Sequence, residues 1–181
     1  SSVVNYSLKD IEFGMALDVT GSMNSNNKLM DMKDATEDII DALFNKSVSE
    51  SHTRIAVAPF SSSVDAGIYR AAVADTTGAV ADNCVIERAD STDAAPIGAN
   101  RLKTAPSAAP LGMYECPDAP VIPLLGMSQS NTLKSKINDY AASGWTAGHI
   151  GAAWGWYLLS PEWDSVFTGA SAPNDYDPAN V

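Results

Sequence analysis

The sequence predicts an α/β fold, in which strands and helices alternate along the chain. A mostly apolar run from Ile11 to Leu17 is typical of a central strand that is buried on both faces. From Lys28 to Phe44, apolar residues recur every three or four positions, which indicates an amphipathic helix. A second apolar run, Arg54 to Phe60, predicts the next strand. Strand, helix and strand in this order favour a sheet that is flanked by helices.

Shorter signals predict the remaining elements. Gly67 to Val73 follows a turn signal and is expected to return as a hairpin partner, which makes the third strand antiparallel. Helices are predicted over Ser130 to Ala142 and over Ala147 to Leu159. The second of these contains three glycines, so burial must hold it, and the glycines would allow close packing on the sheet. We expect a sheet of about three strands with an open edge beside the first strand.

The stretch over about 74–127 interrupts this pattern. It contains six prolines and many small residues, and structureless loops of this length are uncommon in compact domains. We therefore expect a loop-rich insertion within one domain that spans residues 1–181.

Composition narrows the classes of function. The chain has 181 residues, which is enough for one domain with a real core, and a net charge of −11. That charge argues against binding to nucleic acid and to anionic lipid, since both attract basic surfaces. The sequence contains neither a transmembrane run nor a signal-peptide pattern.

Three oxygen-bearing side chains follow the first predicted strand. Asp18, Thr20 and Ser22 stand at alternate positions of one tight turn, at the carboxyl end of that strand. In open α/β sheets, ligands bind at this edge. A carboxylate with two hydroxyls suits a hard divalent cation, with Mg²⁺ as the default and Ca²⁺ or Mn²⁺ as alternatives.

This Asp-x-Thr-x-Ser pattern resembles the metal-ion-dependent adhesion site (MIDAS) of von Willebrand factor A domains, whose fold is a Rossmann-like sheet flanked by helices. The resemblance implies metal ligands at Asp18, Thr20 and Ser22, and a further one at Thr146 in the loop that precedes the last predicted helix. A fifth ligand of the family, an Asp after a later strand, has no counterpart after Thr146. We therefore expect a partial domain, with its later strands beyond Val181.

A second resemblance covers most of the chain. The stretches Val57 to Val64, Trp145 to Trp156 and Leu158 to Trp163 are similar to TadG-like proteins of bacterial Flp/Tad pilus assembly. The resemblance implies a periplasmic or extracellular domain at the cell envelope, anchored in the membrane upstream of this chain. It also implies non-catalytic, cation-dependent adhesion to a protein partner, such as a pilus or envelope component, that supplies an acidic side chain.

The envelope assignment and the loop-rich context predict a disulfide between Cys84 and Cys116, the two cysteines of the chain. A pair of free thiols is the alternative.

Other interpretations of the same residues remain open. The Asp18 motif also resembles that of haloacid-dehalogenase-type phosphotransferases, in which the Asp attacks phosphorus with the help of Mg²⁺. His149 lies three residues after Thr146, but a packed or solvated role is favoured for it. The four tryptophans are assigned to packing rather than to a ligand platform.

Overall fold

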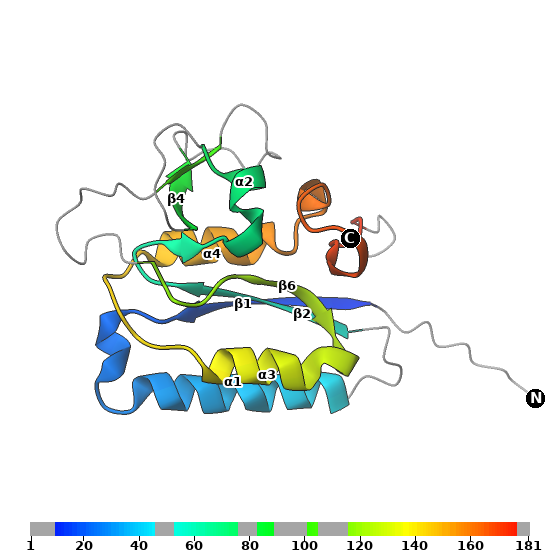
Figure 1. Ribbon diagram of the computed structural model, residues 1–181. Coiled ribbons are helices and arrows are strands. Elements are labelled where there is room, and N and C mark those ends of the chain that lie inside the picture. The colour runs from blue at the N-terminus through cyan, green and yellow to red at the C-terminus, as the bar shows by residue number, and fades with distance from the viewer. Residues whose placement is uncertain (1–9, 46–52, 76–82, 89–100, 105–115, 177–181) are drawn as a thin grey trace, which may run out of the picture.

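A computed structural model describes residues 10–45, 53–75, 83–88, 101–104 and 116–176. The fold is mixed α/β (Figure 1), as the sequence predicts. Three strands form the main sheet in the order β1-β2-β6, namely β1 (Ile11–Asp18), β2 (Thr53–Phe60) and β6 (Ile122–Gly126). β1 and β2 are parallel, while β6 is antiparallel to β2.

Helices cover both faces of this sheet. α1 (Lys28–Asn45) and α3 (Ser130–Asn138) lie on one face, and α4 (Gly148–Tyr157) lies on the other (Figure 1). Beyond α4 lie the short helix α2 (Arg70–Val73) and a second sheet of β3 (Val64–Asp65), β4 (Cys84–Arg88) and β5 (Leu102–Thr104). Single 3-10 turns span Gly21–Asn24, Gly67–Tyr69, Met127–Gln129, Pro161–Trp163 and Gly169–Ser171.

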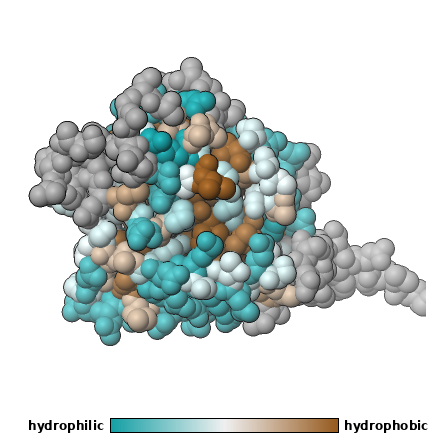
Figure 2. Space-filling view, viewed as in Figure 1, coloured by the Kyte–Doolittle hydropathy of each residue, from teal (hydrophilic) through white to brown (hydrophobic). Residues whose placement is uncertain are grey.

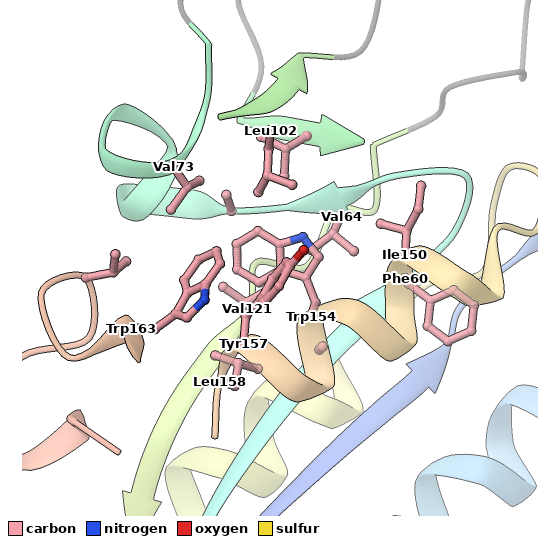
Figure 3. Close-up of a cluster of buried hydrophobic side chains, with 14 of the residues drawn as sticks. Phe60, Val64, Val73, Leu102, Val121, Ile150, Trp154, Tyr157, Leu158 and Trp163 are labelled. Carbon is pink, nitrogen blue, oxygen red and sulfur yellow. The ribbon is translucent and has the colours of Figure 1, made fainter. Parts of the chain in front are cut away.

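β2 is the buried centre of the molecule. Its side chains alternate between the two faces of the sheet, as expected of a strand. Ile55 and Val57 pack toward α1 and α3, while Ala58 and Phe60 join a larger cluster with α4 and the second sheet. Figure 3 shows this larger cluster, in which Tyr157 stacks on Trp163 and meets Trp154 edge-on.

The first strand differs from its prediction. β1 is an edge strand in the described structure, not a central one, and Ile11 and Phe13 are 48% and 37% exposed. The expected sheet of three strands with an open edge beside the first strand is confirmed for the described residues.

The predicted hairpin partner is wrong. Gly67 to Val73 forms a 3-10 turn and the helix α2 instead of a strand. The reason is local, because Gly67 has a φ of +53° and its N–H donates to the Asp65 carboxylate at 2.7 Å, which turns the chain away. The antiparallel strand is β6, which lies inside the range expected to be an insertion.

The remaining elements follow the prediction more closely. α1, β2 and α4 match the predicted ranges to within one or two residues at each end, and α3 ends at Asn138 rather than at Ala142. The predicted disulfide is present, since Cys84 is bonded to Cys116. In the described part of the chain, no helix is long and apolar enough to span a bilayer.

A polar clasp joins the amino ends of β1 and β2 to the end of the described chain. The guanidinium of Arg54 pairs with Glu12 and donates to the carbonyls of Ala170 and Ala172 at 2.9 and 2.8 Å. The backbone N–H of Asn174 donates to the Glu12 carboxylate at 3.0 Å. These contacts hold residues 170–174 beside the start of the main sheet.

α4 approaches the sheet closely at Gly151. A Cβ built at that position would stand 2.2 Å from Cδ1 of the buried Phe60. We predict that Gly151→Ala lowers the free energy of unfolding by about 1–3 kcal/mol, because the core must shift to admit the methyl group. Urea unfolding with the disulfide intact measures the change.

Gly148→Ala is the matched control in the same helix. A Cβ at Gly148 meets nothing within 4 Å. This variant should be neutral or more stable by up to about 1 kcal/mol, because alanine favours helix. Equal losses of stability in both variants would show that close packing is not the reason for the glycine.

Tyr140 generates a second stability prediction. Its side chain is 4% exposed, its hydroxyl has no hydrogen-bond partner in the described structure, and burial raises the pKa of the phenol. Tyr140→Phe should raise the free energy of unfolding by about 1 kcal/mol, because it removes a buried polar group that lacks a partner. The exposed Tyr176 provides the control, since Tyr176→Phe should change nothing. A clear loss of stability in Tyr140→Phe would contradict the prediction.

Candidate functional site

Asp18 ends β1 and begins the turn that carries the candidate site. One oxygen of its carboxylate accepts the Thr20 backbone N–H at 2.8 Å, which fixes the turn. The Val19 N–H donates to the Phe60 carbonyl at 3.0 Å and continues the pairing of β1 with β2. The carboxylate is therefore held at the carboxyl edge of the two parallel strands.

The two hydroxyls of the motif lie together. The Oγ1 of Thr20 and the Oγ of Ser22 are 3.1 Å apart and share a hydrogen bond. Thr20 is fully buried, whereas Ser22 is exposed at the start of a 3-10 turn. The Ser22 hydroxyl therefore faces solvent, and the buried Thr20 hydroxyl forms a hydrogen bond with it.

Two hydrogen bonds join this turn to the loop before α4. The Gly21 N–H donates to the Gly144 carbonyl, and the Ser143 N–H donates to the Val19 carbonyl, each at 2.9 Å. The close approach and the backbone conformation favour glycine on both sides. A Cβ at Gly21 would stand 3.2 Å from the Gly144 oxygen, and Gly144 has a φ of +77°.

Thr146 stands on the same loop and is exposed. The following residue, Ala147, donates its N–H to the Ser61 carbonyl at 2.9 Å, which ties the loop to the turn after β2 as well. In the described structure, no hydrogen bond joins the Thr146 hydroxyl to the other predicted site residues. The structure therefore brings the loop of Thr146 against the turn of Asp18, Thr20 and Ser22.

The donor set fits a hard divalent cation of modest affinity. One carboxylate and neutral hydroxyls are oxygen ligands of the kind that Mg²⁺ accepts, but affinity rises with the number of charged ligands. In the described residues, no group of three or more His, Cys, Asp or Glu side chains is placed to hold a metal ion. Asp18 would be the main source of negative charge at such a site.

The His149 side chain lies beside the carboxylate of Glu87. Its Nε2 lies 3.2 Å from a carboxylate oxygen of Glu87 on β4, and both side chains are largely exposed. The solvated role predicted for His149 agrees with this exposure. Trp154 and Trp163 are buried, as the packing assignment requires, but Trp145 and Trp156 are 62% and 50% exposed.

The sequence predicts a turn after β2, but it does not predict that this turn contacts the loop of Thr146. Ser61 contributes a carbonyl oxygen, and a main-chain contact leaves no signal in side-chain patterns. The neighbouring Ser62 has a buried hydroxyl without a hydrogen-bond partner. A run of three serines directly after a buried strand was the available hint that this edge is polar.

The fold and the site together define an α/β protein with a mixed sheet and a polar turn at its carboxyl edge. Comparison with known families, curated proteins and solved structures finds no match to this chain.

Proposed function

We propose that this chain is a von Willebrand factor A type domain of a TadG-like envelope protein, and that it binds a protein partner through a divalent cation. The function is adhesion in Flp/Tad pilus assembly rather than catalysis. Asp18, Thr20, Ser22 and Thr146 would hold the cation, with Mg²⁺ as the physiological choice.

One observation carries this proposal. Paired hydrogen bonds between Gly21 and Gly144 and between Ser143 and Val19 fasten the two ligand-bearing loops together. The loops come from parts of the chain more than a hundred residues apart, so their meeting is a property of the fold. This arrangement supports a single site at the carboxyl edge of the sheet.

Charge favours an acidic partner. A divalent cation held by one carboxylate and neutral hydroxyls retains a net positive charge, even though the whole chain carries −11. A bound Mg²⁺ would supply a Lewis-acidic position for a carboxylate of the partner. Ser22 and Thr146 are exposed and would flank that carboxylate.

The disulfide supports an envelope location. Disulfides persist in oxidising compartments such as the bacterial periplasm and are rare in the cytosol. The Cys84–Cys116 bond spans 32 residues within the range that the sequence predicts to be loop-rich. The proposal therefore includes a periplasmic or extracellular location for the domain.

Titration calorimetry with Mn²⁺ and with Mg²⁺ tests the site. Asp18→Ala should abolish binding while it leaves the fold intact, because it removes the main charge of the site. Thr146→Ala should weaken binding by about tenfold or less, because it removes one neutral ligand.

Asp34→Ala is the control for charge, because Asp34 is an exposed carboxylate on α1. It should bind either metal as the unmodified chain does. Unchanged affinity in Asp18→Ala would sink the assignment. A phosphorylated Asp18 after incubation with acetyl phosphate and Mg²⁺ would favour the phosphotransferase alternative instead.

A further inference from the structure

Two adjoining cavities lie beside β6, on the side of the main sheet opposite β1. The larger, of about 460 Å³, lies between β6, the 3-10 turn at Gly67–Tyr69 and α3. The smaller, of about 160 Å³, lies between residues 118–120 and the end of α3. Both are lined by Pro120, Ile122 and Lys136, so they lie side by side. We refer to them as the groove and the hollow.

The groove is apolar and open to solvent. Ile122, Pro123 and Leu125 of β6 form one wall, and Ile68, which is 89% exposed, stands on the opposite side. Figure 2 shows hydrophobic residues gathered at the centre of this face, above the hydrophilic surface of the α1 and α3 layer. Large exposed apolar residues grouped in a concave surface are typical of a binding site.

The outer edge of β6 has room for an extended chain. At the start of this edge, the Val121 N–H donates to the Asp65 carbonyl at 2.9 Å, so main chain already pairs there. The chain then turns away at Gly67, and among the described strands only β2 pairs with β6, while the turn Gly169–Ser171 lies close to it. An added strand can bond to such an edge while its side chains enter neighbouring pockets.

The hollow is lined by both apolar and polar side chains and carries a net negative charge. Tyr140 lines it, and the Tyr140 hydroxyl is buried without a hydrogen-bond partner. The carboxylates of Asp118 and Asp139 also line it, with Lys136 as the one basic side chain, which leaves one negative charge in excess. In the described structure, neither carboxylate forms an ion pair.

These features favour an ammonium group in the hollow. Two carboxylates attract it, and a phenol oxygen can accept one of its N–H bonds. Burial raises the pKa of Tyr140, so the phenol stays neutral and does not add a charge of its own. A carboxylate ligand would be repelled by the excess negative charge.

We propose that the groove and the hollow bind an extended peptide segment of a partner protein, with apolar side chains in the groove and an adjacent lysine ammonium in the hollow. This site lies apart from Asp18 and does not depend on the proposed cation site.

Fluorescence anisotropy with short labelled peptides tests the proposal at physiological ionic strength. The probes are blocked leucine-valine-leucine peptides with a lysine at the amino end or at the carboxyl end. Matched probes replace the lysine with glutamate, or the apolar residues with serine. One lysine probe should bind at least about tenfold more tightly than both of its matched probes, because only it satisfies the hollow and the groove together.

Variants of the hollow provide the second arm. Tyr140→Phe should weaken the lysine probe by about fivefold, and Asp118→Asn with Asp139→Asn by about tenfold. Lys136→Gln should strengthen binding by about threefold, because it removes the one repulsive charge. Tyr140→Phe is expected to stabilise the free protein, so weaker binding by this variant cannot be attributed to unfolding.

Asp34→Asn with Asp38→Asn is the control for overall charge, since both residues are exposed on α1. It should bind the lysine probe as the unmodified chain does. Equal weakening in this control, or equal affinity for the glutamate or serine probe, would reduce the effect to general attraction and overturn the proposal. Absence of binding by every probe would also overturn it and would leave the hollow as a site for ordered water.

Discussion

The close approach of α4 to the main sheet is the constraint on which the rest of the structure depends. It is possible because glycines face the sheet, and at Gly151 the Phe60 ring occupies the space that a Cβ would need. On β1, a Cβ at Gly14 would stand 3.0 Å from the Gly155 carbonyl. The helix is therefore seated at a fixed depth, and its first turn fixes the loop that bears Thr146. That loop can bond to the turn of Asp18 only because the helix lies so close.

The side of α4 that faces away from the main sheet holds the loop-rich part of the chain. The guanidinium of the buried Arg88 on β4 lies 5.1 Å from the centre of the Tyr157 ring and 5.5 Å from that of Trp163. Such contacts contribute about 2 kcal/mol when the cation is desolvated. The disulfide from β4 to Cys116 closes a separation of 32 residues, which is worth about 3–4 kcal/mol in the loop-entropy model. Together they attach β4 and β5 to the hydrophobic core around α4.

The sequence allowed the layers of the fold to be predicted, but not the order of the strands. Helical periodicity over Lys28 to Phe44 and the apolar run of β2 are strong signals, because burial of a whole face fixes the pattern of residues. An apolar run indicates that helices cover both faces of a strand, but it does not show whether other strands pair with both of its edges. The apolar run of β1 therefore predicts a central strand where the structure has an edge strand. β6 was missed because it is short and contains Pro123, which is typical of an edge strand and reads as a loop.

The turn of Asp18 and the hollow around Tyr140 also differ in how far the sequence predicts them. The turn of Asp18 could be predicted because its three polar side chains are adjacent in sequence, and the family resemblance supplied Thr146. The hollow around Tyr140 could not, because its lining comes from two segments with no shared pattern. Tyr140 lies two residues beyond the end of α3, and only the structure reveals that its buried hydroxyl lacks a hydrogen-bond partner.

The clasp of Arg54 and Glu12 determines which way the domain faces. It holds Asn174 at the amino end of β1, next to Asp10, so the described chain enters and leaves at one pole of the sheet (Figure 1). Asp18 lies at the opposite end of this eight-residue strand, about 25 Å away at the rise of an extended chain. A tether joined to either end of the described chain would therefore leave the polar turn pointing outward, away from the point of attachment.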